Sequence, residues 1–310
     1  MRYGIHTDIT GSFDGAPLNA IDELVARGRE AHALGLDFYI PQMFQIDALT
    51  ALAVVGREVP GLRVGTAVVP TYPRHPMMLA TQALTANAAA GGNLVLGIGL
   101  SHQLVIENVF GMSYEKPVRH MREFLEILMP ALRGEQLVYK GETLGATMLM
   151  PNQFTGAAVP PVIVAALGSQ MLNLAGRLAD GTALWMTGPK TVADHIVPTI
   201  TKAAADAGRP APHIAMGIPV SVTVDPEGAR DRANKVFAVY NNLPSYRAML
   251  DREGAGGPAD VAVVGDEDTV AAELRRMADL GVTDLTLPVF GSAEEQVRTK
   301  ALLGTLAREG

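Results

Sequence analysis

Short apolar segments alternate with helical patterns along almost the whole chain. Eight segments are apolar throughout or alternate between apolar and polar residues, as β-strands do; they span residues 2–9, 37–43, 63–69, 93–100, 161–167, 181–187, 214–224 and 283–290. Strands that are apolar on both faces are typical of a parallel sheet that helices cover on both sides.

Helical stripes lie between these segments. Apolar residues recur there at spacings of three and four, which puts them on one face of a helix; the stripes are Val118, Met121, Leu125, Leu128 and Met129, then Met171, Leu174, Ala175 and Leu178, then Val270, Leu274 and Met277. Eight strand–helix units fit a (β/α)8 barrel, with an open doubly wound sheet as the alternative. We therefore predict an α/β fold of the TIM-barrel type.

Two stretches interrupt this alternation. Residues 134–158, "GEQLVYKGETLGATMLMPNQFTGAA", indicate a hairpin with a glycine turn and a loop, and residues 241–262 form a second excursion that contains Pro, Gly and Arg. Long insertions in a barrel usually form a lid or a wall of the active site, although plain surface loops are the alternative. Since no Pro/Ser linker divides the chain, we predict a single domain over residues 1–310.

Composition and charge narrow the class of protein. The net charge of −7, without a basic cluster, argues against nucleic acid or an anionic membrane as partner. The chain has no cysteine, which excludes disulfides and thiolate chemistry, and no apolar run of the ~20 residues that a membrane helix needs. The seven histidines show no HxxxH or HExxH pair, and neither GxSxG nor GxGxxG occurs. We expect a soluble, cytoplasmic protein without a metal site.

Function in a barrel lies at the carboxyl ends of the strands. The fifth segment ends in Gly168, Ser169, Gln170 and Met171, at the start of a helix. Free backbone N–H groups and the positive end of the helix dipole suit a phosphate there, and Ser169 is a good N-cap residue. A helix that is capped and binds no ligand is the alternative.

Polar residues also follow the other predicted strands. The fourth contains Gly97 and Gly99, which are costly in a strand unless a backbone or a ligand needs the room, and is followed by Ser101 and His102. A histidine at this position can transfer a proton near neutral pH, with a solvated loop histidine as the alternative.

The remaining strand ends complete a polar pocket. His6 lies at the end of the first strand, and Gln42 and Met43 end the second. Trp185, the only tryptophan, ends the sixth. We expect Gln42, Met43 and Trp185 to line a substrate pocket, although a tryptophan at such a position also serves as a core residue.

Four segments in this order resemble the luciferase-like flavin/deazaflavin oxidoreductase family. They are "GTAVVPTYPRHPMMLATQALTAN", "GGNLVLGIGLSH", "AALGSQMLNLAGRLADG" and "VVGDEDTVAAELRRMADLGVTDLTL". The stretches "GLSHQ", "LGSQM" and "LADGTALWMTGP" resemble most the actinobacterial branch that uses the deazaflavin coenzyme F420. The resemblance implies a (β/α)8 barrel with an insertion, usually dimeric, that binds its cofactor across the carboxyl ends of the strands.

The resemblance also implies roles for particular residues. The cofactor phosphate would bind at Gly168–Met171 beside Ala166, and the ring would contact a non-prolyl cis bulge around Ala67, Val68 and Val69, with Gly99 and Leu100 along it. Ser101 and His102 would lie near the reactive edge of the ring. His102 is the first candidate for the proton donor, and Ser101 or His6 the second. The region "YIPQMF" lacks the acid–histidine pair of the sugar-phosphate dehydrogenases, so their reaction is not implied.

The resulting hypothesis is an F420-dependent oxidoreductase that transfers hydride to or from a small organic substrate, as a homodimer. An FMN-dependent monooxygenase that uses reduced flavin and oxygen is the alternative, since its phosphate would bind the same turn. A barrel that binds a metabolite without turnover is a second alternative. A phosphate-binding isomerase is a third, with Gly291-Ser292 as its turn. Arg74, His75 and Lys190 are candidates to bind the anionic tail of a deazaflavin.

Overall fold

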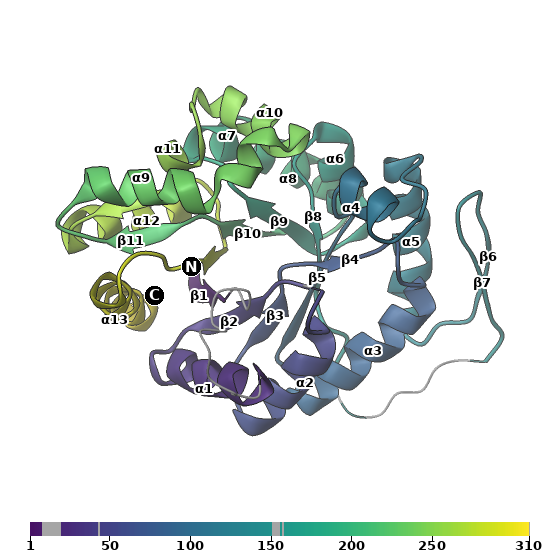
Figure 1. The fold of residues 1–310 in the computed structure, drawn as a ribbon. Helices are drawn as coiled ribbons and strands as arrows, with labels where there is room; N and C mark the ends of the chain where they lie inside the picture. Colours follow the sequence, from purple (N-terminus) through teal and green to yellow (C-terminus); the bar gives the residue numbers. More distant parts are fainter. Residues whose placement is uncertain (8–19, 43, 151–155, 157, 310) are drawn as a thin grey trace.

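The fold is a closed parallel barrel, seen from one end in Figure 1. The computed structural model describes residues 1–7, 20–42, 44–150, 156 and 158–309. β3 pairs with β2 and also with β5, which closes the ring and confirms the prediction of a barrel over an open sheet. The strands, in order around the ring, are β3 (Val64–Thr66), β2 (Asp37–Ile40), β1 (Arg2–His6), β13 (Asp284–Leu287), β10 (His213–Gly217), β9 (Gly181–Trp185), β8 (Val162–Ala165) and β5 (Leu94–Gly99), and β4 (Val69–Pro70) continues the position of β3.

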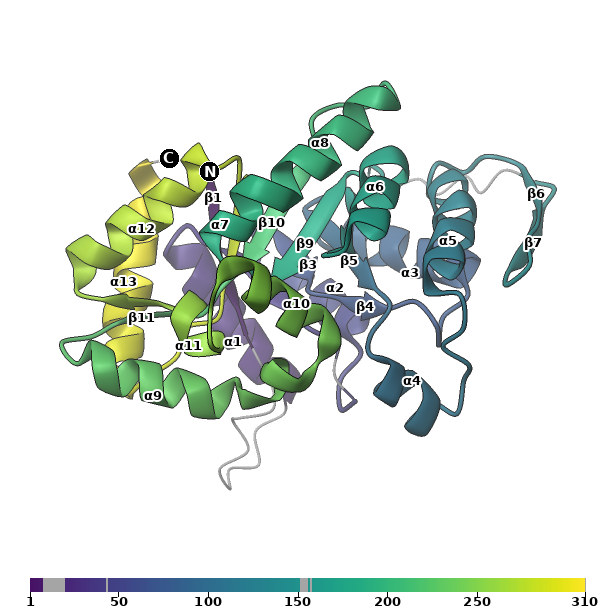
Figure 2. The same cartoon turned by 90° about the horizontal axis from the view of Figure 1, so that it is seen from above.

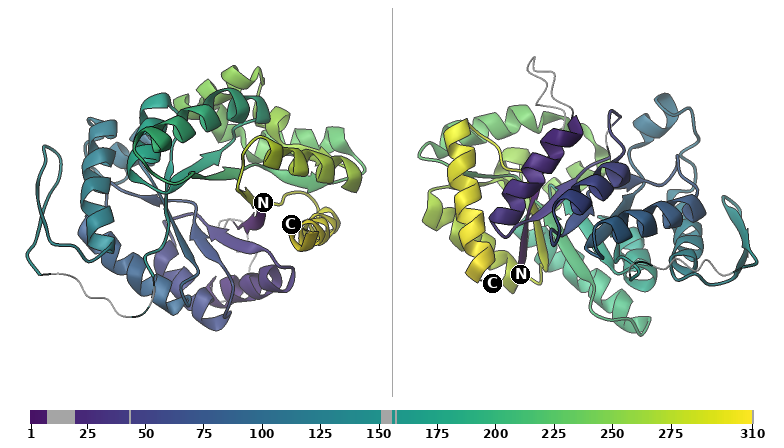
Figure 3. Two further views of the ribbon diagram at one scale, coloured as in Figure 1. Left: turned by 180° about the vertical axis from the view of Figure 1, so that it is seen from behind. Right: turned by 90° about the horizontal axis from the view of Figure 1, so that it is seen from below.

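Helices surround the barrel on its outer side, as Figures 1 and 3 show. The three predicted apolar stripes lie on α5, α6 and α12, and most of their residues are buried. The helices are α1 (Ala20–Ala33), α2 (Ala48–Glu58), α3 (Pro76–Ala89), α4 (Gln103–Asn108), α5 (Pro117–Leu132), α6 (Ser169–Leu178), α7 (Pro189–Thr191), the π-helix η1 (Val192–Ile196), α8 (Val197–Asp206), α9 (Pro226–Val236), the 3-10 helix η2 (Ala238–Asn242), α10 (Pro244–Glu253), α11 (Pro258–Val261), α12 (Glu267–Asp279) and α13 (Ala293–Glu309).

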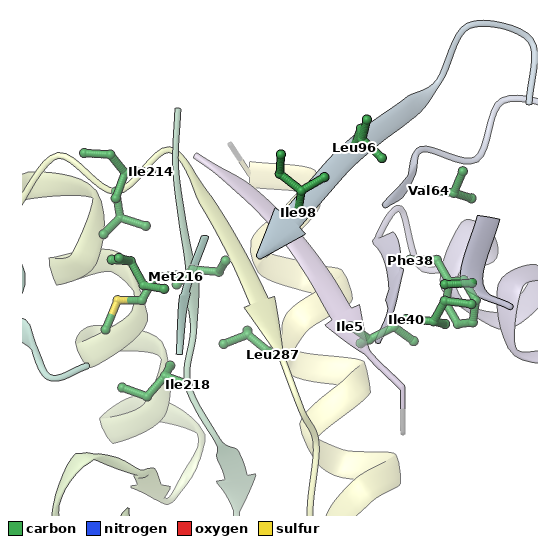
Figure 4. Close-up of a cluster of buried hydrophobic side chains, with 14 of the residues drawn as sticks. Ile5, Phe38, Ile40, Val64, Leu96, Ile98, Ile214, Met216, Ile218 and Leu287 are labelled. Atoms are coloured by element: carbon green, nitrogen blue, oxygen red, sulfur yellow. The ribbon is translucent and has the colours of Figure 1, made fainter. Parts of the chain in front are cut away.

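The main core lies between the strands and the helices. Figure 4 shows large aliphatic side chains of this layer, among them Ile40, Leu96 and Met216, all of which are fully buried. Burial of one such side chain contributes about 1.5–3 kcal/mol to folding. The barrel interior holds a smaller cluster that includes Tyr39 and Ile163. Continuous apolar strands were therefore the correct signal for a sheet buried on both faces.

The seventh predicted strand, residues 214–224, is wrong as a single element. It divides at Pro219 into β10 and a second strand, β11 (Val220–Val222). Proline lacks the N–H that a central strand needs, so the chain leaves the barrel there. β11 pairs instead with β12 (Val263–Gly265), outside the barrel.

The first excursion is a hairpin, as predicted. β6 (Leu137–Lys140) and β7 (Gly145–Met148) pair in antiparallel fashion and project to one side of the barrel in Figures 1 and 2. The buried carboxylate of Glu123 on α5 accepts hydrogen bonds from the turn, at the backbone N–H groups of Glu142, Thr143 and Leu144. Residues 151–155 and 157 of this excursion lie outside the described residues.

The amino ends of the strands carry a charge cluster. The guanidinium of Arg63 donates to Asp37 and Asp284, each at 2.7 Å, and to the hydroxyl of Tyr39 at 3.2 Å. Both carboxylates are almost fully buried. His213 lies 3.5 Å from Asp284 on the same side. These contacts tie the starts of β2, β3, β10 and β13 together at the end of the barrel that the predicted site does not use.

Candidate functional site

A line of aromatic rings crosses the carboxyl end of the barrel. Trp185, at the end of β9, lies with its ring centroid 5.4 Å from His6 at the end of β1 and 5.5 Å from Tyr240. Tyr240 contacts Tyr246 at 5.1 Å, and Tyr246 contacts His102 at 5.8 Å. The structure therefore brings together three residues that the sequence assigned to one site, and links them through Tyr240 of η2 and Tyr246 of α10.

The predicted bulge follows β3. The peptide bond between Ala67 and Val68 is cis, within the range Ala67–Val69 that the resemblance implied. The N–H of Ala67 still donates to Ile40, and Val69 is buried in the core. Ala67 and Val68 are only partly buried, and Ala67 packs against the interior cluster that includes Tyr39 and Ile163.

The glycines of β5 make room for this bulge. A Cβ on Gly97 would lie 2.0 Å from the carbonyl oxygen of Thr66, and a Cβ on Gly99 would lie 2.8 Å from Val68. The hydroxyl of Thr66 also exchanges hydrogen bonds with the backbone of Gly97, at 2.7 and 2.8 Å. Gly97 and Gly99 are thus required by the close approach of Thr66 and Val68, rather than by a ligand. Gly99 is buried beneath the bulge.

The start of α6 offers backbone donors. Gly168, rather than the expected Ser169, occupies the N-cap position, and no side chain caps the helix. Gly168, Ser169 and Gln170 are exposed, Met171 is partly buried, and a Cβ on Gly168 would meet no atom within 4 Å. The first N–H groups of a helix lack partners within the helix, so this turn is an open site for an anion.

Two other helix starts are already filled by carboxylates. On α13, Ser292 N–H donates to Glu295 at 2.7 Å while Glu295 N–H donates to the Ser292 hydroxyl at 3.2 Å, a capping box. On α7, Glu253 accepts from the N–H groups of Lys190 and Thr191, at 3.0 and 2.7 Å. The carboxylates would repel a phosphate at both helix starts. The turn at Gly291-Ser292 is therefore disfavoured as a phosphate site, and the start of α6 is favoured.

Two residues from neighbouring elements hold the α6 turn in position. His195, in the π-helix η1, donates from Nε2 to the carbonyl of Leu167 at 2.8 Å. Thr182 on β9 donates to the carbonyl of Ala166 at 3.2 Å. Ala166 is buried in the core, so its side chain supports the turn from below. These contacts position the backbone directly before the open donors.

Ser101 and His102 lie between β5 and α4. Ser101 has a φ of 62°, in the left-handed region that residues other than glycine rarely adopt. His102 is the N-cap residue of α4 and makes no capping hydrogen bond, which leaves its ring free to face Tyr246. Burial lowers the pKa of His102 below its usual value of 6.5, so the imidazole is neutral at pH 7. Leu100, just before, is partly buried.

The second strand end is partly occupied by its own loop. The amide of Gln42 donates to Ile46 and accepts from Ala48, both at 3.0 Å, and Arg74 also donates to it. Met43 lies outside the described residues. Gln42 therefore holds the loop between β2 and α2 in place.

The rim cations named from the sequence have partners within the protein. Arg74 forms an ion pair with Asp47, and His75 caps α3 and contacts the carbonyl of Gly145. Lys190 pairs with Asp194 at 2.7 Å. None of the three is therefore an unpaired charge that is available to bind an anionic tail.

Sequence reasoning missed the tyrosines and His195. Tyr240 and Tyr246 belong to "VYNNLPSYR", whose place beside His102 depends on the whole fold rather than on a local pattern. The expected wall from residues 134–158 is not seen in the described part of the hairpin, whose hydrogen bonds go to α5 and His75. Among the described residues, no three His, Asp or Glu side chains gather as metal ligands, and no helix has the length and apolarity to cross a bilayer.

Comparison with known proteins gives three informative matches. The 5,10-methylenetetrahydromethanopterin reductase of Methanolobus tindarius is 23% identical, over 81% of this chain and 85% of its own. The coenzyme F420 dependent tetrahydromethanopterin reductase from Methanopyrus kandleri has a similar structure, with a TM-score of 0.78 at 19% identity over 98% and 97% of the two chains. The FMN complex of the oxygenating constituent of 3,6-diketocamphane monooxygenase from Pseudomonas putida is similar too, with a TM-score of 0.77 at 15% identity over 100% and 97%.

The structural matches confirm the barrel, and the sequence match confirms the family. The profile of luciferase-like monooxygenases covers residues 1–284, which is most of the chain. An aromatic line, a cis bulge beside β5 and an open helix start all lie at the carboxyl end, where a barrel enzyme has its site. The chain therefore belongs to the luciferase-like monooxygenase family of oxidoreductases.

Proposed function

We propose that this protein transfers hydride between a deazaflavin of the F420 type and a small organic substrate. The observation that carries the proposal is the uncapped start of α6 at Gly168–Met171, beside the cis bulge and the aromatic line. The F420 dependence of the Methanopyrus kandleri reductase supports the choice of cofactor.

The residues present fit a flat, phosphate-bearing cofactor. Ala67 between β3 and β4, Ala165 on β8 and Ala183 on β9 are partly buried and have small side chains, which a flat ring could approach closely. The indole N–H of Trp185 is buried and has no acceptor within the described residues, which leaves one donor for a ligand. When bound, a deazaflavin supplies the ring carbon that gains or loses hydride, and the protein supplies orientation and proton transfer.

His102 is the residue that we assign to proton transfer. Its neutral ring suits the removal of a proton from a substrate hydroxyl as hydride leaves the adjacent carbon. In the opposite direction the protonated ring returns the proton. Tyr246 contacts the imidazole, Ser101 precedes His102 in the chain, and His6 lies at the other end of the aromatic line.

Titration of the purified protein with F420 and, separately, with FMN tests the proposal by the change in ring fluorescence. Tight binding of F420 with weak binding of FMN supports it and directs a substrate screen to alcohols and ketones. The reverse preference would favour the FMN-dependent monooxygenase, which the FMN-bound relative of the same fold makes the second candidate. Binding of neither would refute the assignment at Gly168–Met171.

A further inference from the structure

A groove on the outer side of the barrel lies largely outside the site described above. It lies between α5 and α6, has a volume of about 540 Å³, and falls in the size range of ligand sites. Figure 2 shows the two helices side by side. We call it the α5–α6 groove; its lining is Val118, Arg119, Arg122 and Glu126 on α5 and Gln170, Asn173, Leu174, Arg177 and Leu178 on α6.

The groove has an apolar floor and a cationic rim. Val118, Leu174 and Leu178 are partly buried, whereas Arg122 and Arg177 are exposed. The lining has three arginines and one glutamate, so it is positive although the whole chain carries a charge of −7. A positive groove on an acidic protein is a local feature that bulk composition does not produce.

Two of these arginines have no partner. Arg119 forms an ion pair with Glu142, and Glu126 accepts a hydrogen bond from the Tyr139 hydroxyl. Arg122 and Arg177 make no hydrogen bond or ion pair with any described residue. Arg74 and Lys190 at the rim are paired, whereas Arg122 and Arg177 in the groove are not.

The groove begins at the open helix start. Gln170 belongs both to the exposed turn of α6 and to the groove lining. The lining continues from Gln170 to Leu178, which at 1.5 Å per residue is about 12 Å along the helix. A ligand whose phosphate bound at Gly168–Met171 could therefore extend into the groove without leaving the protein surface.

We propose that the α5–α6 groove binds a chain of carboxylates that extends from the phosphate of the cofactor, the oligoglutamyl tail of a deazaflavin. The inference rests on the proposed function, because it needs the phosphate at the start of α6. Arg122 and Arg177 are the recognising groups, since carboxylates of glutamate are ionised at pH 7 and pair with guanidinium. FMN ends at its phosphate and would leave the groove empty.

The test compares two ligands and two double variants of the full-length protein. The ligands are F420 with its oligoglutamyl tail and the same phosphate-bearing deazaflavin without glutamates. The variant is Arg122→Ser with Arg177→Ser. The control, Arg57→Ser with Arg230→Ser, makes the same change of charge at exposed arginines on α2 and α9 that have no ion pair. Fluorescence titration gives each Kd at low and at high salt.

We expect the wild-type protein to bind the tailed cofactor more tightly, and high salt to reduce the difference. Two exposed ion pairs predict a roughly two- to thirtyfold loss for the tailed cofactor in the groove variant, with the tail-free ligand and the control unchanged. Equal affinity of the wild type for both ligands would overturn the groove and leave the proposed function intact. A tail preference that survives in the groove variant would overturn it too. If neither ligand binds, the proposed function fails, and the groove inference with it.

Discussion

Replacement of Gly168 by aspartate should stabilise the protein and weaken its cofactor binding at the same time. Gly168 has a φ of −79° and a ψ of 151°, which any residue adopts, and its Cβ would meet no atom. Aspartate at this N-cap can accept from the open N–H groups, and loss of glycine lowers the entropy of the unfolded chain. Together these effects predict a gain of about 0.5–1 kcal/mol in the free energy of unfolding.

The same carboxylate would occupy the proposed phosphate site. Two unit charges about 4 Å apart repel by roughly 1 kcal/mol in water and about 4 kcal/mol at the effective dielectric of a protein surface. The Kd for F420 or FMN should therefore rise by a factor of about 5 to 900. Thermal unfolding of the protein without cofactor measures the first effect, and fluorescence titration measures the second.

Two further substitutions separate charge from shape. Gly168→Asn adds a cap of the same size without charge, and Gly168→Ala adds only a methyl group. If the phosphate binds at α6, Gly168→Asp weakens binding far more than either control. Normal cofactor affinity in a stable Gly168→Asp protein would refute the reasoning, and equal losses in all three would show a steric rather than an electrostatic cause.

Three other predictions follow from contacts described above. His102→Ala should lower turnover by ~10²–10⁴ with cofactor Kd unchanged, and turnover of wild-type protein in the proton-accepting direction should fall as the pH drops through the lowered pKa of His102; a turnover loss below threefold would remove His102 from the mechanism. Arg63→Met removes the shared partner of the buried carboxylates Asp37 and Asp284, which keep Arg2 and His213 respectively, so urea unfolding should show a loss of at most about 3–5 kcal/mol. The hydrogen bond to Asp284 raises the pKa of His213 above 6.5 despite burial. The stabilisation of the fold by this charged pair is present below pH 6.5 and is lost as the pH rises through the raised pKa. His213→Asn should therefore lower the free energy of unfolding by up to about 1 kcal/mol at pH 5.5 and by nothing at pH 9, and an equal cost at both pH values would contradict the reasoning.

The barrel could be predicted because its signals are local. Each strand is an apolar run of its own, and each helix has its own stripe, as on α5 and α6. The strand ends then followed from the rule that parallel strands share one carboxyl end, which is why His6, Ser101, His102 and Trp185 were assigned to one site before their distances were known.

The parts that failed depend on contacts between distant segments. Nothing in "VYNNLPSYR" tells that Tyr246 lies beside His102, since 144 residues of sequence number separate the two positions. The pairing of Arg74 with Asp47 depends likewise on how two loops meet. Local patterns define elements, whereas the partner of a charge or a ring is defined only by the completed fold.

The segment between β11 and β12, residues 223–262, contains the second excursion and is anchored as a replaceable module. The chain leaves after β11 and returns at β12, and these strands pair with each other, so the ends of the excursion are fixed whatever lies between them. Changes of length in such a closed loop cost little, because closure entropy grows slowly with length. Tyr240 and Tyr246 sit on this module, while the open turn of α6 sits elsewhere. Exchange of residues 223–262 between relatives would therefore replace Tyr240 and Tyr246 by recombination of one contiguous segment, while Gly168–Met171 at the start of α6 stay in place.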